Sequence, residues 1–448
     1  MTTPMHTDSR SSEAGRTSGR ADVVVLGGGA VGLSTAWYLV EAGARVTVID
    51  RMSAGDKAST GNAGMLVPSH VIPLSAPGVI SKGLRWMLSS SSPFHISPRL
   101  NLDFLRWLWI FARHANPKHV AYGIPILRDL SMESLRLFDT LCGGDGPGAS
   151  PGTASTPPLP GTGYSRTGLL MLHRGDVARR DNLHEADLAE GAGLDLRRLS
   201  EAEARALEPD IRTNITGGVF YATDAAIHPE RFLAAMETAL RARGVEFVDA
   251  SALRLDRQVG VVLDGTAEDG RRSIDGDFVV VAAGAWTPGL IRTLGTGLRL
   301  PVEPARGYSI TVKTHDAAIR IPSVLMDERI TVTPMAGEIR FSGTLTLSGF
   351  NTRVEARRVE SVRHLAQLYA GPSLTIEKPG VWAGFRPASP DGLPIIGPVP
   401  GAERFLLASG HGMLGVTQAP ITGHLIADIL SERTPILDPR PLLPSRFI

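Results

Sequence analysis

The sequence predicts an α/β protein (α+β overall), with a Rossmann-like domain assembled from discontinuous segments and an inserted domain on a mostly antiparallel sheet. Three observations support this prediction. A strand, a turn of small residues and a helix follow one another near residues 25, 280 and 405. β-rich or irregular segments separate these junctions, and the chain has no internal repeat. Such junctions build a parallel sheet that binds a nucleotide at the carboxyl ends of its strands.

The junction near residue 25 is the most complete. The apolar run Val23–Leu26 is typical of a buried strand, and the turn Gly27-Gly28-Gly29-Ala30-Val31-Gly32 follows it directly. A helical segment continues to about Ala42, and a second apolar run then ends on Asp50. This order of strand, glycine turn, helix, strand and acid is the full dinucleotide-binding unit, which makes an ordinary glycine-rich turn the weaker interpretation.

Each part of this unit has a physical role. Gly27 permits a tight turn, Gly29 lets the backbone approach a pyrophosphate, and Gly32 lets the helix pack closely on the strand. The free amides at the start of the helix then face the phosphates. Asp50 lies 23 residues after Gly27, near the spacing expected of a carboxylate that accepts a hydrogen bond from a ribose hydroxyl.

Other segments provide further walls for an extended ligand. The loop KASTGNAGMLVPSH, residues 57–70, is crowded with small residues whose amides and hydroxyls suit phosphates and a ring system. Phe278–Ala282 and Phe405–Ala408 are predicted strands, each followed by a glycine-containing turn. We expect a helix from about Gly415 to Leu430 after the second of these turns.

The intervening segments predict the second domain. Strands are expected at Gly168–Arg174 and Gly217–Tyr221, and alternation around a turn at residues 336–337 predicts an antiparallel region. Helices are expected at about 125–141, 176–191, 200–209, 228–244 and 353–369. Ser200 can cap the helix that begins there, with Glu203 at the capping-box position.

The segment LDFLRWLWIFARH has apolar residues at helical spacing. The predicted apolar stripe consists of Phe104, Leu105, Leu108, Phe111 and Ala112, and Trp107 and Trp109 widen it. The default interpretation is core packing, and the alternative is a contact with a membrane surface or a partner, because tryptophan and arginine suit an interface.

Composition excludes several classes of function. With a net charge of +1 and scattered basic residues, the 448-residue chain gives no sign of nucleic-acid binding. Cys142 is the single cysteine, which excludes an intramolecular disulfide framework. The 12 histidines form no HxxxH or HExxH pair, so no metal site is predicted.

Two segments and the membrane topology are also predicted from composition. Residues 1–20 are polar and are expected to be a disordered tail rather than a secretory signal. Residues 143–163, rich in glycine, proline, serine and threonine, are expected to be a flexible surface insertion. No transmembrane helix is predicted.

Five motifs then carry a resemblance to a known family. They are TGNAGMLVPS, APGVISKGLRWM, PARGYSIT, GFRPASPDGLPIIG and SGHGMLGVTQAP. With these motifs the chain resembles the D-amino-acid dehydrogenase branch of the flavin-dependent amino-acid oxidoreductases, related to glycine oxidase and sarcosine oxidase. The resemblance extends from about Ala21 to Pro435 and excludes residues 143–163.

The resemblance implies FAD as the cofactor. It implies an FAD-binding domain made of residues 21–85, 223–299 and 380–435, and a substrate-binding domain made of residues 86–222 and 300–379. The implied FAD-binding residues are Gly27, Gly29, Ala30, Val31, Gly32, Asp50, Arg51, Ser59, Thr60, Asn62, Ala63, Gly64, Leu253, Ala283, Gly284, Gly410, Gly412 and Met413.

The resemblance also implies three residues of an active site. Arg386, in GFRP, occupies the position of the arginine that binds the substrate carboxylate, and a guanidinium suits a carboxylate because it forms two parallel bonds. Tyr308 is a second donor to the carboxylate or a lid, and His411 lies at the flavin. Arg306 and His228 are weaker candidates whose alternative role is packing or pairing with an acid.

The implied reaction is oxidative deamination of a D-amino acid by hydride transfer from Cα to flavin N5, followed by hydrolysis of the imino acid to a 2-oxo acid and ammonia. Alternative substrates are D-proline, cis-4-hydroxy-D-proline, glycine and sarcosine, and a non-enzymatic alternative is an electron-relay subunit. The electron acceptor is left open between a quinone, another carrier and oxygen. A cytoplasmic location is expected, with peripheral contact to the inner face of the cytoplasmic membrane as an option and the oligomeric state left undecided.

Overall fold

This computed structural model describes residues 20–51, 57–77, 94–97, 99, 101–143, 157–265, 267, 269–313, 319–370, 376 and 379–448. The predicted tail, apart from Arg20, lies outside the described residues, as do residues 144–156 of the predicted insertion. Most of the segment APGVISKGLRWM is also outside them.

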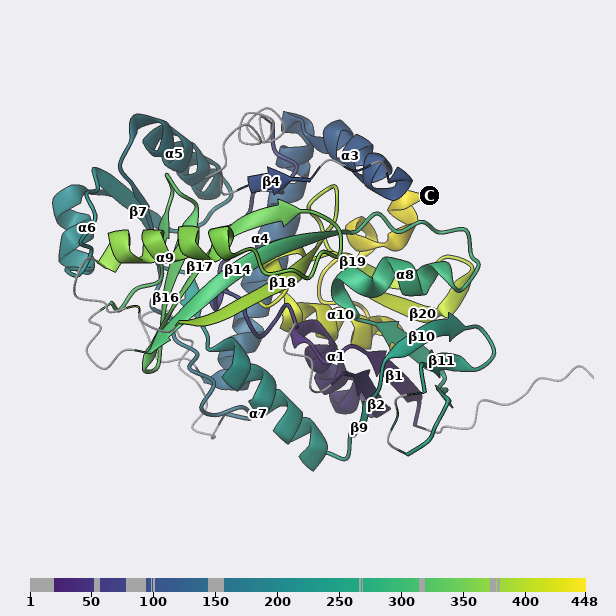
Figure 1. The fold of residues 1–448 in the computed structure, drawn as a ribbon. Helices are drawn as coiled ribbons and strands as arrows, with labels where there is room; N and C mark the ends of the chain where they lie inside the picture. The colour runs from purple at the N-terminus through teal and green to yellow at the C-terminus, as the bar shows by residue number, and fades with distance from the viewer. Residues whose placement is uncertain are drawn as a thin grey trace, which may run out of the picture.

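The three predicted junctions meet in one six-stranded sheet, drawn on the right of Figure 1. Strands β1, β2, β9, β13 and β20 pair in parallel, and β19 pairs with β20 in the antiparallel direction. The sheet order is β19 (Ile395–Val399), β20 (Ala402–Ser409), β13 (Phe278–Val281), β1 (Asp22–Leu26), β2 (Arg45–Asp50) and β9 (Glu246–Asp249). The predicted α/β class is confirmed, since strands separated by hundreds of residues align with their carboxyl ends at one edge.

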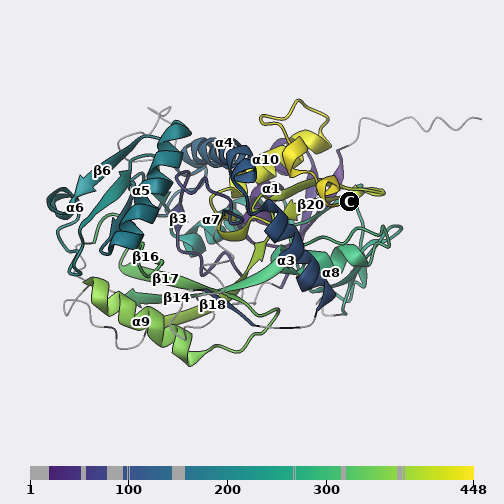
Figure 2. The same ribbon diagram turned by 90° about the horizontal axis from the view of Figure 1, so that it is seen from above.

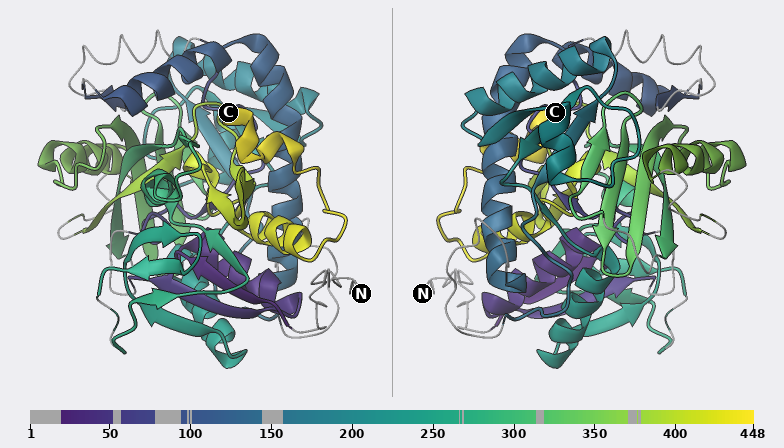
Figure 3. Two further views of the ribbon diagram at one scale, coloured as in Figure 1. Left: turned by 90° about the vertical axis from the view of Figure 1, so that its right-hand side faces the viewer. Right: turned by 90° about the vertical axis from the view of Figure 1, so that its left-hand side faces the viewer.

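Both faces of this sheet are covered. One face packs against α1 (Ala30–Glu41), α7 (Pro229–Ala242), α10 (Ala419–Leu430) and the carboxyl-terminal half of α4 (Pro117–Cys142). Helices α1 and α10 approach closely because Gly423 has no side chain: a Cβ there would clash with the carbonyl of Ser34. Figure 3 shows α4, in blue, running beside α10, in yellow.

A small sheet and a short helix cover the opposite face. The sheet consists of β10 (Ala252–Asp256), β11 (Gly260–Leu263) and β12 (Ser273–Ile274), and the helix is α8 (Thr287–Arg292), preceded by η1 (Gly284–Trp286). Their buried residues form one apolar cluster with Val279 and Val281 of β13. The chain ends with two short 3₁₀ turns, η4 (Arg440–Leu442) and η5 (Pro444–Phe447).

The second sheet is mixed, mostly antiparallel and nine-stranded. Its order is β18 (Gly380–Ala388), β14 (Glu303–Lys313), β17 (Glu338–Leu347), β16 (Ile330–Met335), β15 (Ser323–Leu325), β5 (Leu169–His173), β7 (Gly217–Tyr221) and β6 (Leu196–Ser200), with β4 (Phe94–Ile96) paired to β17. Pairing is parallel at β15/β5 and at β17/β4. Figure 2 shows α9 (Ala356–Ala370) on one side of this sheet and α4 on the other.

The remaining elements join the two sheets. Helices α5 (Asp176–Gly191) and α6 (Glu201–Leu207) flank β5 and β7, and α6 begins with the predicted capping box of Ser200 and Glu203. The short strand β3 (Met65–Leu66) pairs with β8 (Ala225–Ala226), which ties the loop after β2 to the segment after β7. Helix α3 (Leu102–His114) packs with Phe104, Trp107 and Phe111 against β14, β17 and β18.

Some elements differ from the predictions. Helix α4 begins at Pro117, eight residues before the predicted start, and contains Pro125 in its interior. In α3 the predicted stripe is wrong at Leu105, Trp109 and Ala112, which are exposed, whereas Trp107 is buried as expected. Helix α10 begins at Ala419 rather than near Gly415, because the 3₁₀ turn η3 (Gly412–Leu414) and a further turn precede it.

The predicted division into two domains stays a proposal. Strand β18 pairs with β14 of the mixed sheet, so the boundary proposed at residue 380 does not coincide with a boundary between the sheets. The carboxyl-terminal half of α4 belongs to the same core as α1, although residues 86–222 are proposed as substrate domain. Side-chain packing, which single-sequence patterns do not encode, decides both placements.

Candidate active site

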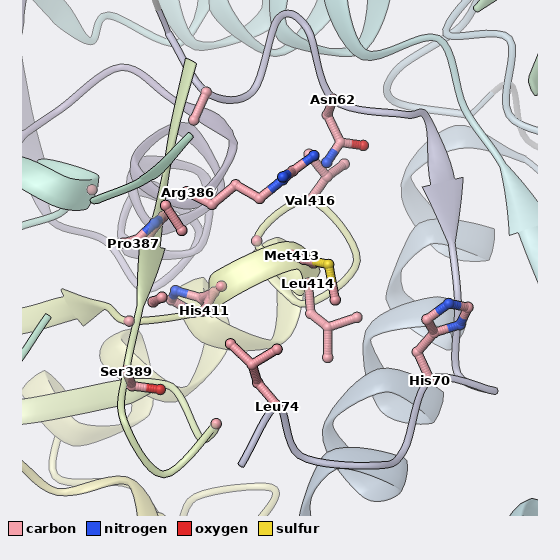
Figure 4. Close-up of a pocket in the computed structure, with 18 of the residues that line it drawn as sticks. Asn62, His70, Leu74, Arg386, Pro387, Ser389, His411, Met413, Leu414 and Val416 are labelled. Atoms are coloured by element: carbon pink, nitrogen blue, oxygen red, sulfur yellow. The ribbon is translucent and has the colours of Figure 1, made fainter. Parts of the chain in front are cut away.

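A cavity of about 1710 Å³ extends from the carboxyl ends of the parallel strands to the inner face of the mixed sheet and to α4 and α5. Ligand sites for a drug-sized molecule are typically about 300–1,000 Å³. The volume therefore suits an extended cofactor together with a substrate. Figure 4 shows the part of its wall that carries Arg386, His411 and His70.

The glycine turn after β1 forms one end of the cavity. Gly27 has a φ of 117°, and a Cβ there would clash with the carbonyl of Ala282 at the end of β13. A Cβ on Gly32 would clash with the carbonyl of Gly27, so Gly32 packs the helix on the turn and does not itself line the cavity. Helix α1 has no side-chain cap at Gly29, which leaves its amino-terminal backbone at the cavity wall. An uncapped helix start of this kind suits a phosphate.

Asp50 and Ser59 lie beside this turn. Asp50 forms an ion pair with Lys57, and both side chains line the cavity next to Arg51. The hydroxyl of Ser59 accepts a hydrogen bond from the amide of Ala30 at 3.0 Å. The two predicted residues thus flank the start of α1 from different segments.

The loop after Ser59 is held by strands of the mixed sheet. Arg340 of β17, which is buried, donates to the carbonyls of Thr60 at 2.8 Å and Asn62 at 2.9 Å. Ser309 of β14 donates to the carbonyl of Gly61 at 3.2 Å. Asn62 and Ala63 line the cavity, whereas Thr60 and Gly64 do not. Sequence patterns gave no sign of Arg340 or Ser309, because their role depends on contacts between distant segments.

The two later junctions provide the remaining walls. Ala283 and Gly284 follow β13, and the hydroxyl of Ser409 donates to the carbonyl of Gly284 at 2.9 Å. Gly410 and Gly412 have φ values of 79° and 55°, and both line the cavity with Met413. The glycine-containing turn predicted after β20 is present: Gly410 follows the strand, and Gly412 and Met413 belong to the 3₁₀ turn η3, before α10 begins at Ala419.

Arg386 projects into the cavity from β18, as Figure 4 shows. Its Nη1 donates to the carbonyl of Thr344 at 3.2 Å, and its guanidinium lies over Gly307 of β14. Burial lowers the pKa of Arg386 to about 10, which still leaves the group charged at neutral pH. Among the described residues no carboxylate lies within ion-pair distance of it.

His411 is a neutral, oriented group in the same region. Its Nε2 lies 2.9 Å from the hydroxyl of Thr422, and that hydroxyl donates to the carbonyl of Gln418 at 2.7 Å. The single hydroxyl proton is therefore committed to Gln418, and Nε2 of His411 is the donor to Thr422. Burial lowers the pKa of His411 to about 3, so the imidazole is uncharged at neutral pH.

Tyr308 does not reach the cavity, which contradicts its predicted role as a carboxylate donor or lid. Residues Ala305, Gly307 and Ser309 of β14 face the cavity and the loop after Ser59, so the alternation of the strand turns Tyr308 the other way. Tyr308 is buried on the same face as Arg306, whose guanidinium lies 5.2 Å from its ring.

The weaker candidates are also outside the cavity. Arg306 donates to the carbonyls of Thr352 and Arg353, so it holds the segment before α9. His228 occupies the cap position of α7 and lies 3.5 Å from Glu230. Leu253 is 63% exposed on β10, and Ala250, Ser251 and Ala252 line the cavity in its place.

Several lining residues were not predicted. Trp382 of β18 lies against Gly61 and Gly384, at both of which a Cβ would clash with the indole. His70 and Arg329 line the part of the cavity next to α4 and α5. His70 ends the loop noted in the sequence, but its spacing carried no signal for a site.

Comparison with known proteins decides the family. A family model described as FAD dependent oxidoreductase matches residues 22–429. The chain belongs to this family. It is 31% identical over 447 residues to a D-amino acid dehydrogenase of Cereibacter sphaeroides, with 95% of each chain covered. It is 30% identical over 441 residues to a D-amino acid dehydrogenase of Rhizorhabdus wittichii, with 95% of this chain and all of the relative covered.

Solved structures agree on the fold. Glycine oxidase from Geobacillus kaustophilus aligns with a TM-score of 0.70 and 22% identity, covering 96% of this chain and 99% of its own. L-proline dehydrogenase from P. horikoshii aligns with a TM-score of 0.66 and 17% identity, covering 96% and 98%. The resemblance predicted from the five motifs is confirmed.

FAD is the cofactor of this family, which confirms the cofactor prediction. The residues present fit it: three separate junctions and the 59–63 loop converge on one long cavity, and the glycine turn leaves the start of α1 open to a diphosphate. Among the described residues no group of three or more potential ligands could hold a metal ion. No described helix is both long and apolar enough to cross a membrane.

Proposed function

We propose that this protein oxidises D-amino acids to imino acids, which water converts to 2-oxo acids and ammonia. When bound, FAD accepts the hydride that leaves Cα of the substrate. The oxidoreductase class follows from the family, and the D-amino-acid class is supported by the two relatives that carry that name. Gly27, Gly29, Ala30, Asp50 and Ser59 would hold the cofactor at the glycine-turn end of the cavity.

The observation that carries the proposal is that Arg386 is buried and charged and has no counterion among the described residues. Its charged guanidinium faces the cavity and has no carboxylate partner among the described residues. In the same cavity Lys57 is paired with Asp50, and Arg329 is paired with Glu185. A buried cation without a counterion is costly, and an anionic substrate removes that cost. A guanidinium favours a carboxylate because two parallel hydrogen bonds form.

The surrounding residues suit hydride transfer. Leu74, Leu414 and Val416 line the same cavity as Arg386 in Figure 4, and their apolar side chains would exclude water from a substrate bound between them. His411 is neutral, and its Nε2 donates to the hydroxyl of Thr422. It therefore adds no positive charge that would compete with Arg386 for the substrate carboxylate. The protein thus supplies orientation and charge, and no side-chain nucleophile is needed.

Anaerobic reduction of the bound flavin tests this function. The holoenzyme is mixed with D- and L-alanine, D-proline, glycine and N-methylglycine, and flavin bleaching is followed. We expect bleaching by D-amino acids. Bleaching by glycine or N-methylglycine alone, with hydrogen peroxide formed in air, would replace the proposal by an amine oxidase. No bleaching by any of them would favour an electron-relay flavoprotein.

We further propose a peripheral contact of α3 with a membrane that holds a quinone acceptor. Leu102, Leu105 and Trp109 are 79%, 46% and 58% exposed on this helix, and the Arg113 guanidinium lies 4.7 Å from the Trp109 ring. Exposed apolar and aromatic residues next to a cation suit an anionic lipid surface. Co-sedimentation with anionic vesicles should fall in the Leu105→Ser/Trp109→Ser double variant, and binding equal to wild type would refute the contact.

A further inference from the structure

Three side chains form a hydrogen-bonded chain that ends on the cavity wall beside α4. Asp224 is fully buried, Ser69 is buried, and His70 is half-buried and lines the cavity. In Figure 4 His70 and Arg386 come from different sides of the cavity, with Met413 and Leu414 between them in the view. The two groups therefore lie on separate parts of the wall of the same cavity.

The pairing of β3 with β8 explains how this chain is held. Asp224 directly precedes β8, and Ser69 follows β3 by three residues. The amide of Ser69 donates to Oδ1 of Asp224 at 3.1 Å, and the hydroxyl of Ser69 donates to Oδ2. The carboxylate of Asp224 thus accepts hydrogen bonds from both the amide and the hydroxyl of Ser69.

The direction of these bonds fixes the imidazole. Nδ1 of His70 lies 3.2 Å from the hydroxyl oxygen of Ser69. Burial raises the pKa of Asp224 to about 7, so the carboxylate is ionised above that pH and accepts the one proton of the hydroxyl. Nδ1 of His70 must then carry the proton that it donates to Ser69. Nε2 is then an acceptor, and no described residue hydrogen-bonds to it. Burial and nearby Arg329 lower the pKa of His70 to about 4, so the ring is neutral at neutral pH.

The cavity wall next to α4 and α5 carries apolar residues and paired charged residues. Ile72, Val120 and Ile124 line it, and Arg329 is paired with Glu185 at 3.0 Å. The other charged lining residues of this end also have partners: Arg128 is paired with Asp129, Asp187 is paired with Arg198, and Asp181 has an interaction of its own. A charged substrate side chain would therefore have to compete for these partners, whereas a neutral hydrogen-bond donor would satisfy Nε2 of His70.

We propose that His70 selects substrates whose side chain carries a neutral hydrogen-bond donor, a hydroxyl or a carboxamide, over alkyl side chains of the same size. Ser69 and Asp224 are positioning residues that keep Nε2 unprotonated. This inference rests on the proposed amino-acid oxidation, because it assigns the side-chain end of that substrate to the wall opposite Arg386.

Two pairs of substrates test the selection by anaerobic flavin reduction at pH 8, above the pKa of Asp224. D-Threonine and D-valine are isosteric, and cis-4-hydroxy-D-proline is D-proline with one added hydroxyl. One hydrogen bond to a buried acceptor predicts a preference of about tenfold in kcat/KM for the donor member. We expect His70→Leu to remove the preference by raising KM for the donor member of each pair, and His70→Gln to restore part of it. An unchanged preference in His70→Leu would overturn the proposal.

A binding measurement separates this inference from the proposed function. The dissociation constants of 3-hydroxy-3-methylbutanoate and 3,3-dimethylbutanoate are read from the flavin absorption spectrum of the holoenzyme, with no oxidation required. A hydroxyl preference lost in His70→Leu supports the assignment of His70 even if no amino acid bleaches the flavin. Equal binding of both acids to wild type would refute it. His364→Leu, on the exposed face of α9, is the matched control.

Asp224→Asn gives a readout that a merely structural role would not produce. The amide of Ser69 requires the oxygen of the new carboxamide at the Oδ1 position, so the carboxamide nitrogen faces the Ser69 hydroxyl and donates to it. Ser69 then donates to Nδ1 of His70, and Nε2 becomes a donor. We expect 3-methoxypropanoate, whose side chain only accepts, to bind about tenfold more tightly than to wild type at the same pH. Unchanged binding of this ligand would overturn the positioning role of Asp224.

Discussion

The guanidinium of Arg386 rests on the bare α-carbon of Gly307. The two residues belong to neighbouring antiparallel strands, β18 and β14, and a Cβ at Gly307 would clash with Cζ, Nη1 and Nη2 of Arg386. The space that a side chain at position 307 would fill is occupied by the guanidinium of Arg386, which can move, and not by backbone, which cannot. The position of the proposed carboxylate-binding group depends on a residue that contacts no substrate itself.

Gly307→Ala should consequently displace Arg386 without unfolding the sheet. We expect KM for a D-amino acid to rise about tenfold or more, because a misplaced guanidinium loses one of two parallel hydrogen bonds, while FAD content stays at the wild-type level. Steady-state kinetics and the flavin absorbance per protein measure the two effects. Gly380→Ala, in the same strand as Arg386 but at a position where a Cβ makes only ordinary contacts, is the control. A normal KM in Gly307→Ala would contradict the prediction.

Arg386 itself should contribute strongly to catalysis. Loss of one partner of a buried charge pair costs about 2–5 kcal/mol, so Arg386→Ala should lower kcat/KM by roughly 10²-fold or more. Arg386→Lys keeps the charge but loses the paired geometry, and we expect an intermediate loss. Both variants are compared with Arg363→Ala, an exposed change on α9. A loss of less than about threefold in Arg386→Ala would exclude it as the carboxylate-binding residue.

Gly32→Ala should affect the cofactor rather than the substrate. A Cβ at Gly32 would meet the backbone carbonyl of Gly27, which cannot move without opening the turn. We expect FAD affinity to fall by about tenfold or more, since the diphosphate wall is displaced. The FAD retained after gel filtration and the dissociation constant from flavin fluorescence measure this effect. Full retention of FAD would show that the turn tolerates a larger residue.

Asp224 should give the stability a distinctive dependence on pH. Burial raises the pKa of Asp224 from 3.8 to about 7, so the folded protein keeps a proton that the unfolded chain loses between about pH 4 and 7. The free energy of unfolding therefore falls as pH rises through this range, by at most about 4 kcal/mol from this group.

Asp224→Asn removes that dependence, because the amide does not titrate. The difference in apparent melting temperature between Asp224→Asn and wild type should increase in favour of the variant from pH 5 to pH 8. Asp195→Asn, at an exposed aspartate, is the control. A difference that stays constant between these pH values would show that Asp224 is ionised throughout.

The sequence predicted the parts of the fold that depend on local patterns. The apolar run Val23–Leu26, the glycines after it and the capping box of Ser200 and Glu203 have the structures expected of them. Packing between distant segments overrode local signals elsewhere. Pro125 lies inside α4 rather than at its start. In α3 Leu105 faces outward although it was expected in the apolar stripe, because the helix packs through Phe104, Trp107 and Phe111.

The candidate site shows the same division. Gly27, Asp50 and Ser59 line the cavity as predicted, since their place follows from the strand and turn that carry them. Tyr308 was expected there and lies on the opposite face of β14, because the sequence did not reveal which alternate residues of that strand face inward. His70 and Arg340 were missed because each acts through residues more than 100 positions away.

The sequence by itself determined the cofactor class and the end of the protein that binds it, because a dinucleotide turn is built from consecutive residues whose backbone conformations are local. Tertiary structure decided which side chains complete the rest of the cavity. Arg386 depends on Gly307 from another strand, and His70 depends on Asp224 through the pairing of β3 with β8. Burial and hydrogen bonding between distant segments set the charge of these side chains and decide which of their atoms donate or accept. A local sequence pattern reveals neither the burial nor these hydrogen bonds.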